Sequence, residues 1–358
     1  MLRIDAEVFA YADAGTLDGL KQALQFAIEI EHATMPPYLF ARYSLGASNG
    51  PLIQILREIY IEEMHHMLIA GNLLKAIGGN PIIDTPSFVP SFPTHLPGTV
   101  ANELIVPLAP FSKLLVEDVF MRIEQPQQIL DFPVVAAAAA APPAKTIGEF
   151  YGRIRDVFEA SGDDLIVDKT GADQLETFSF TGVQKVTSAA LALEAIDLIV
   201  EQGEGTSSEP TFPDGDNNLN NDELAHYYRF AEIVKGRLKK NPTATPASPP
   251  EDRYFYDPTD PVPFEQGKVL PLRHNPKRSD FASGSSAQLA IDEFNQGYTE
   301  VLRKLHVAFN GAPGEIFNAV NAMNRMGGLA GRILAIELDD GTRPGPSFEY
   351  FTEPRAFV

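Results

Sequence analysis

Two polar residues, Glu63 and His66, interrupt an otherwise apolar stripe along residues 51–77. The stripe repeats every three or four residues from Leu52 to Ile77 and is apolar except at these two positions. Residues at this spacing share one face of a helix, so the pattern predicts a buried face that carries a carboxylate and an imidazole. A buried ionised carboxylate is costly unless it is paired or binds a metal. The chain is therefore expected to fold as helices that pack around a polar interior.

Helical patterns of apolar residues recur over most of the sequence. Residues 16–45 and 51–77 predict an antiparallel helix pair, with Thr16 as the N-cap of the first helix. Pro36 and Pro37 are expected to kink or interrupt that helix, because proline lacks an N–H and clashes with the preceding turn. Further helices are predicted over residues 101–124, with breaks at Pro107 and Pro110, and over residues 146–160, 183–205, 222–240, 287–311 and 314–338.

These patterns predict an all-α fold, a four-helix bundle with additional C-terminal helices and long irregular loops. We expect a single domain over residues 1–358, with the bundle core at about 16–240. The proline-rich residues 241–284 are expected to form an irregular loop, and residues 285–340 a helical pair packed on the bundle. The alanine-rich residues 134–145 are interpreted as a spacer.

Charge and composition exclude several classes of partner and site. The formal net charge is -20 and no cluster of lysine or arginine is present, which argues against nucleic acid and anionic lipid. The absence of cysteine excludes disulfides and thiolate ligands, so any metal must be bound by oxygen and imidazole. No uninterrupted apolar stretch is long enough to span a bilayer, and the N-terminal residues do not resemble a signal peptide. We expect a cytoplasmic protein with no membrane partner.

Polar residues that lie on an apolar helical stripe can be sought on every predicted helix. On residues 51–77, Glu62 and His65 lie on a mixed stripe, which predicts that these two lie at the rim of the bundle. On residues 183–205 the stripe favours Glu204 and keeps Glu201 as the alternative. The residues expected to face inward are Glu31, Glu63, His66, Glu204, Glu223 and His226.

This set has the composition of a dinuclear metal site. One glutamate from each of two helices, with Glu-x-x-His from each of two others, is the arrangement of di-iron and di-manganese carboxylate bundles. Two divalent ions would also offset the repulsion between several buried carboxylates. Carboxylate and imidazole ligands suit iron or manganese. We therefore expect two iron ions, with manganese as the alternative.

Several segments carry a resemblance to a known family. They include AIEIEHATMPPYLFARYSL, IYIEEMHHMLIAGNLLKAIGGNP, FMRIEQP, AIDLIVEQGEGT, ELAHYYRF, YTEVLRKLHVAFNGAPGEIFNAVNAM and GPSFEY. The chain resembles the ferritin-like family of the iminophenyl-pyruvate dimer synthase type. That family includes the ferritin-like region of the long enzymes of violacein and rebeccamycin pathways. The match runs over most of the chain, outside the alanine tract and parts of the proline-rich loops.

The resemblance implies a ferritin-like bundle with a dinuclear metal site. It implies that Glu63 and Glu223 bridge the ions, whereas Glu31 and Glu204 cap them. This chain departs from the family at His65, where an aliphatic residue is expected. The family's metal ligands, matched motif by motif to this sequence, are implied to be Glu31, Glu63, His66, Glu204, Glu223 and His226.

The leading functional hypothesis is a non-haem di-iron oxidoreductase that uses O2 or peroxide on a small aromatic or amine-derived metabolite. Because the chain resembles only the ferritin-like part of the pigment enzymes, their imine-coupling reaction does not follow. Two alternatives stay open: a metal-binding or storage protein without turnover, and a metal-free helical bundle. The expected partner is a small-molecule substrate, with a homodimer left open as the assembly.

Overall fold

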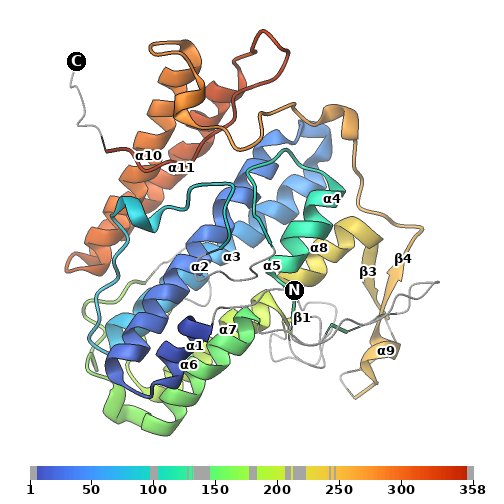
Figure 1. The fold of residues 1–358 in the computed structure, drawn as a ribbon. Helices are drawn as coiled ribbons and strands as arrows, with labels where there is room; N and C mark the ends of the chain where they lie inside the picture. Colours follow the sequence, from blue (N-terminus) through green and yellow to red (C-terminus); the bar gives the residue numbers. More distant parts are fainter. Residues whose placement is uncertain are drawn as a thin grey trace.

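The fold is a bundle of helices in which the N-terminal pair lies at the centre (Figure 1). The computed structural model describes residues 6–96, 104–126, 129–130, 132, 146–176, 184–205, 211–212, 223–241, 243–245 and 247–352. The alanine-rich residues 134–145 lie outside the described residues. The predicted all-α class is confirmed, with two short two-stranded sheets as the β structure of the described residues.

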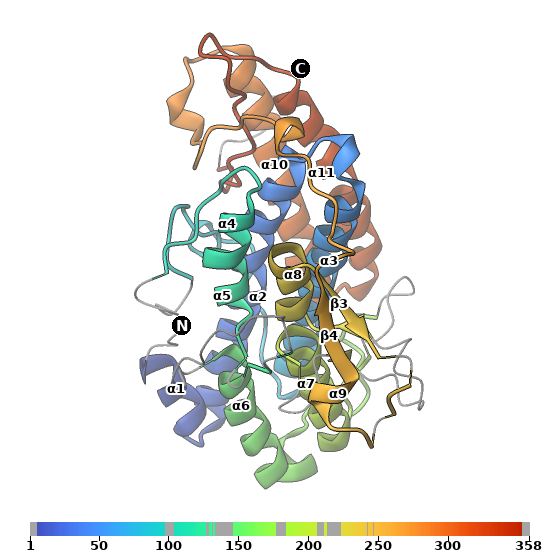
Figure 2. The ribbon, with the colours of Figure 1, turned by 90° about the vertical axis from the view of Figure 1, so that its right-hand side faces the viewer.

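The central pair consists of α2 (Leu17–Ser44) and α3 (Gly50–Ala76), which pack side by side along their length (Figures 1 and 2). Thr16 caps α2 as predicted, because its hydroxyl accepts a hydrogen bond from the Gly19 N–H at 3.1 Å. Helix α2 continues through Pro36 and Pro37, so the expected interruption is wrong. Residues 30–38 are all buried, and their packing on every side offsets the hydrogen bonds that the prolines cannot make.

The segment after the pair is less helical than predicted. Among the described residues of this segment, 104–112 are irregular and the first helix is α4 (Lys113–Leu115). A π-helical turn, η4 (Val116–Phe120), and α5 (Met121–Ile123) continue it. Pro107 and Pro110 explain the late start, because neither can donate a backbone hydrogen bond. This short helical segment lies beside the central pair and ends at Glu124.

Two further helices, α6 (Ile147–Ser161) and α7 (Ala189–Gly203), close one end of the bundle together with the N-terminal α1 (Ala6–Asp13) (Figure 1). Helix α7 starts later than predicted. The Gln174 side chain binds the backbone of Val186, accepting from its N–H at 2.6 Å, and Ser188 then caps the helix. The bound backbone of Val186 is consequently not free to join an α-helical turn.

The predicted helix over residues 222–240 is shorter at both ends. Residues Glu223–Leu224 form strand β2, which pairs with β1 (Thr211–Phe212), and helix α8 spans His226–Lys235. Gly236 ends α8 with φ of 108°, a backbone conformation that favours glycine. The chain then forms β3 (Arg237–Lys240), paired with β4 (Tyr254–Asp257) after the short helix α9 (Pro250–Arg253).

The predicted C-terminal helical pair is present as α10 (Ser286–Phe309) and α11 (Ile316–Leu334), which pack on the outer side of α2 and α3 (Figure 1). His32 of α2 is buried against α10, and the Tyr298 hydroxyl lies 2.6 Å from His32 Nε2. Burial lowers the pKa of His32 to about 3, so this histidine is neutral near pH 7. A single domain over residues 1–358 stays a prediction, which these contacts support.

Gly71 of α3 sets how closely α10 approaches the bundle. A Cβ atom at Gly71 would lie 2.3 Å from the ring of Phe309, so there is no room for a side chain. Gly71→Ala is expected to destabilise the protein by about 1–3 kcal/mol through overpacking, measured by chemical denaturation. Gly331→Ala on α11 is the matched control, because nothing lies within 4 Å of its added Cβ. Equal stability of the two variants would show that α10 does not pack here.

Within the described residues, none of the helices combines the length and apolar character that crossing a bilayer requires.

Candidate metal centre

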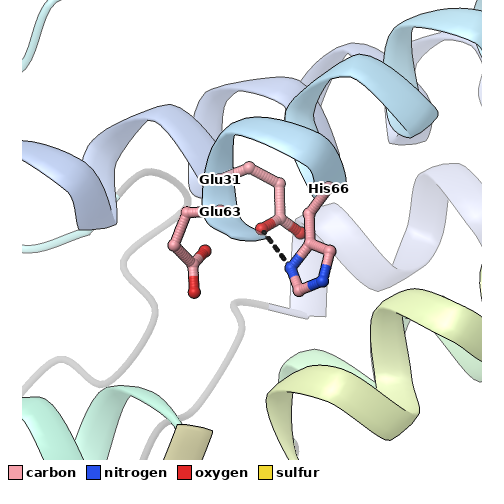
Figure 3. Close-up of side chains that lie close together, drawn as sticks. All are labelled: Glu31, Glu63 and His66. Carbon is pink, nitrogen blue, oxygen red and sulfur yellow. Dashed lines mark ion pairs between the residues drawn. The ribbon is translucent and has the colours of Figure 1, made fainter. Parts of the chain in front are cut away.

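A group of three buried side chains lies between the central helices. Glu31 extends from α2, and Glu63 and His66 extend from α3 into the same space (Figure 3). His66 Nδ1 lies 3.6 Å from Glu31 Oε2. One potential ligand atom from each of the three residues lies within 4.8 Å of the others. The sequence analysis predicted these three residues as ligands, and the structure brings them together.

A second group shares Glu63 with the first. It consists of Glu63, Glu124 and His226, whose potential ligand atoms also lie within 4.8 Å of one another. His226 Nδ1 lies 2.7 Å from Glu63 Oε1 and 3.6 Å from Glu124 Oε2. The rings of His66 and His226 are stacked with centroids 5.5 Å apart, so the two groups are adjacent. All five side chains are buried.

Glu124 is the residue that the sequence analysis missed. It follows α5 at the end of the short helical segment, and its motif FMRIEQP has no histidine three residues later. A usable signal was present, because Val116, Phe120 and Glu124 form a row at a spacing of four that is apolar except for the carboxylate. This row spans only about two turns, so it stands out less than the stripe that carries Glu63 and His66.

Glu223 is not brought into either group. It lies in strand β2 and its side chain is 67% exposed, with one oxygen 3.9 Å from Arg229. The expectation that Glu223 and His226 share a helix face is wrong, because α8 begins only at His226. A spacing of three places two side chains on one face only when both residues are helical.

Glu204 lies close to the groups without belonging to them. It follows the last turn of α7, where its carboxylate accepts hydrogen bonds from the Gly148 N–H at 2.7 Å and the Thr146 hydroxyl at 3.3 Å. A Cβ at Gly148 would lie 2.5 Å from Glu204 Oε2, so glycine is needed for this approach. Glu201, the predicted alternative, is half-buried and does not line the cavity described below.

A small cavity of about 20 Å³, with room for about one water molecule, connects Glu204 to the two groups. Glu31, Glu63, His66 and Glu124 line its polar side, whereas His226 does not line it. Apolar side chains form much of the remaining wall, namely those of Ile123, Ile147, Ile199 and Val200.

The buried carboxylates strongly perturb one another. Burial and the nearby negative charge of Glu124 raise the pKa of Glu63 to about 8. Burial alone would lower the pKa of His226, but the charge of Glu63 and hydrogen bonds with neighbouring carboxylates hold that pKa well above its usual range. Mutual repulsion of this kind is what a bound cation relieves.

Two facing atoms of the second group fit a metal ion better than a hydrogen bond. Among the described residues, Glu63 Oε1 and His226 Nδ1 are buried polar atoms that make no hydrogen bond, although they lie only 2.7 Å apart. Buried polar atoms without a partner are rare in native proteins. An ion coordinated by both atoms would satisfy them, so the residues present fit a divalent metal.

Outer hydrogen bonds orient both histidines so that Nδ1 faces the groups. His66 Nε2 donates to Gln202 Oε1 at 2.9 Å, and His226 Nε2 donates to Glu62 Oε2 at 2.7 Å. In the neutral form of each ring the lone pair is therefore on Nδ1, the nitrogen that points to the carboxylates. Such an outer partner on the second nitrogen is the usual companion of a metal-binding histidine.

Glu62 and His65 are buried, so their predicted place at the rim is wrong. Glu62 is covered by Arg229 of α8, which hydrogen-bonds the same oxygen that His226 binds. Burial would raise the pKa of Glu62, but the hydrogen bond from His226 and the charge of Arg229 lower it to about 2. His65 belongs to neither group, and burial lowers its pKa to about 4.

Hydroxyl groups hold the outer oxygens of the three carboxylates. Tyr151 donates to Glu31 Oε1 at 2.6 Å, and Tyr38 donates to Glu124 Oε1 at 2.5 Å. Thr34 donates to Glu63 Oε2 at 3.1 Å. In Glu31 and Glu124 the second oxygen faces a histidine Nδ1, so one oxygen is positioned and the other is directed into the site.

The family of the protein follows from this fold and from a direct match. The model of the Ferritin-like family matches residues 24–235, more than half of the chain, and the protein therefore belongs to the Ferritin-like family. A crystal structure of a ferritin like protein from Caulobacter vibrioides is similar, with a TM-score of 0.59 and 21% sequence identity. The similarity covers 92% of this chain and 97% of that chain and concerns the fold alone. No curated protein matches the chain.

Proposed function

We propose that this protein is a non-haem dinuclear oxidoreductase of the iminophenyl-pyruvate dimer synthase type. It would bind two iron ions, or two manganese ions, and act with O2 or peroxide on a small aromatic or amine-derived metabolite. The observation that carries the proposal is the pair of Glu/Glu/His groups that share Glu63. Di-iron and di-manganese sites in helical bundles use four glutamates and two histidines. The two groups supply both histidines and three of the glutamates, and Glu204 lies close by.

The residues divide into those that would hold the ions and those that position them. Glu31 and His66 would hold one ion, Glu124 and His226 the other, and Glu63 both. When bound, the ions would supply the redox chemistry that activates the oxidant. Tyr38 and Tyr151 keep one oxygen of each terminal carboxylate fixed, which limits the ways in which these carboxylates can turn.

The cavity beside the groups would take a small oxidant or the reacting end of a substrate, because it has room for about one water molecule. Isoleucine and valine side chains form much of its wall, and Glu204 adds a carboxylate near the same space. A carboxylate beside an apolar wall favours a ligand that carries an amine. Glu204, predicted as a ligand, is proposed here as a residue of the cavity wall, because its hydrogen bonds to Gly148 and Thr146 hold it there.

The first test is the metal content of protein purified without chelators, measured by elemental analysis. The wild-type chain is expected to carry close to two equivalents of iron or manganese. His66→Ala is expected to lose about one equivalent or more, because it removes a ligand from the first group. The neighbouring His65→Ala is the matched control, since His65 is buried on the same helix but belongs to neither group.

The outcomes separate the proposal from its alternatives. A wild-type protein that takes up no metal, even when iron is supplied, would favour the metal-free bundle. Metal binding in a large multi-subunit shell, seen by native mass spectrometry, would favour storage. A monomer or homodimer that consumes O2 or peroxide with a small metabolite would support the oxidoreductase.

A further inference from the structure

The two groups are nearly alike in the atoms that face the ions. In each, one carboxylate oxygen lies 3.6 Å from a histidine Nδ1, Glu31 with His66 and Glu124 with His226. In each, a tyrosine hydroxyl holds the other oxygen of that carboxylate. Any difference between the two positions must therefore come from the surroundings of these atoms.

The outer partners of the two histidines differ in charge. His66 donates to the neutral amide of Gln202, which is half-exposed on α7. His226 donates to the carboxylate of Glu62, which is buried and hydrogen-bonded by the guanidinium of Arg229. The acceptor of His226 is thus a carboxylate paired with a guanidinium, whereas the acceptor of His66 is an amide.

This difference changes how strongly each imidazole binds a cation. A hydrogen bond to an anionic acceptor draws the Nε2 proton away and makes the opposite nitrogen more basic. A neutral amide has a weaker effect of the same kind. His226 is consequently the stronger donor of electron density, and His66 the weaker.

The shared carboxylate and the cavity add to the asymmetry. Glu63 Oε1 already lies 2.7 Å from His226 Nδ1, so part of the second group is assembled before an ion arrives. Glu31, Glu63 and His66 all line the cavity, whereas in the other group Glu63 and Glu124 line it and His226 does not. An ion between Glu31, Glu63 and His66 would therefore be bound by the weaker imidazole donor and have all three of its ligands on the cavity.

We propose that the two metal positions are inequivalent: the Glu63, Glu124 and His226 position fills first and holds its ion more tightly, and the Glu31, Glu63 and His66 position exchanges more readily. The inference rests on the proposed function, because it requires that both positions bind metal. The weaker position is the one whose three ligands all line the cavity, through which an oxidant would reach it.

Manganese(II) alone tests the order of filling without any activity assay. Chelator-treated protein is titrated with Mn2+ and followed by electron paramagnetic resonance and by isothermal titration calorimetry. The first equivalent is expected to give the spectrum of an isolated ion, and the second a coupled pair with weaker affinity. In crystals grown with half an equivalent of Mn2+, the anomalous peak is expected between Glu124 and His226.

Reciprocal exchange of the outer partners tests the cause. Gln202→Glu gives His66 an anionic acceptor and is expected to tighten the weaker position by about 10-fold, the lower end of the effect of such partners. Glu62→Gln is expected to weaken the tighter position by about 10–100-fold. Because Glu62→Gln also leaves Arg229 without its buried partner, the half-exposed Gln202 provides the variant that is expected to fold normally.

Controls lie on the same two helices away from the site. Glu58→Gln on α3 removes the same charge as Glu62→Gln, and Glu194→Gln on α7 changes the charge of the helix that carries Gln202 by one unit in the opposite sense. Both residues lie outside the cavity and their replacement is expected to leave both affinities unchanged. Equal filling of the two positions, or first filling at His66, would overturn the inference and leave the proposed function intact. Unchanged affinities in Gln202→Glu would overturn the assigned cause. Failure of the wild type to bind Mn2+ or iron at all would overturn the proposed function itself.

Discussion

Glu63→Gln is expected to remove nearly all bound metal, from close to two equivalents to near zero. Glu63 is common to both groups, so its loss takes a ligand from each position at once. The affinity is expected to fall roughly 100-fold or more at both positions, beyond the effect of an outer partner. The amide keeps the size of the side chain and can still accept the hydrogen bond from Thr34. Elemental analysis and titration with Mn2+ measure the change.

The same variant gives a second readout in thermal unfolding. An ion that binds only the folded state at 100 times its Kd stabilises it by about 2.7 kcal/mol, so chelation is expected to lower the wild-type Tm by roughly 5 °C. Glu63→Gln is expected to show no such fall. Glu58→Gln on the same helix is the control and should behave as wild type, since it lies outside the cavity. If Glu63→Gln keeps two equivalents and the full chelator effect, Glu63 is not a shared ligand.

Glu124→Gln is expected to lower the metal content and Glu223→Gln to leave it unchanged, although Glu223 was the residue predicted from the sequence. Glu124 is buried and its Oε2 lies 3.6 Å from His226 Nδ1, so its replacement is expected to remove about one equivalent of metal. The side chain of Glu223 is 67% exposed and belongs to neither group, so its replacement is expected to change nothing. Elemental analysis of the two variants in parallel measures this contrast.

The pair of variants is its own control, because both remove one carboxylate charge. Tyr38 can still donate to the amide in Glu124→Gln, which keeps the local packing. Retention of two equivalents in Glu124→Gln together with a loss in Glu223→Gln would reverse the assignment. It would mean that residues 223–226 become helical and bring Glu223 inward when metal binds.

The residues on the long helices were predictable because their pattern repeats over many turns. Helices α2 and α3 each extend over seven turns or more at 3.6 residues per turn, so a polar residue on the apolar stripe has one consistent orientation. Glu31, Glu63 and His66 lie on such stripes, and the structure brings them together. The all-α class and the C-terminal helical pair follow from patterns of the same kind.

The residues at helix ends were not predictable in this way. The pairing of Glu223 with His226 assumed a helix that in fact begins at His226. Glu124 ends a short helical segment with a π-helical turn, where too few turns exist for a stripe to stand out. The residue at which a helix starts depends on contacts of the preceding residues. Before α8, Glu223 pairs with Phe212 in the β1–β2 sheet, so the helix starts only at His226.

The sequence by itself determined which faces of the long helices are buried, and with them three buried ligand candidates. His226 was also selected from the sequence, but only the tertiary structure decided that Glu124, and not Glu223, lies beside it. Glu62 lies off the apolar stripe of α3 and is buried because Arg229 and His226 reach it across 164 or more residues of sequence. The reason is physical: helical periodicity is a local property of the backbone, whereas burial of a single side chain depends on what packs against it.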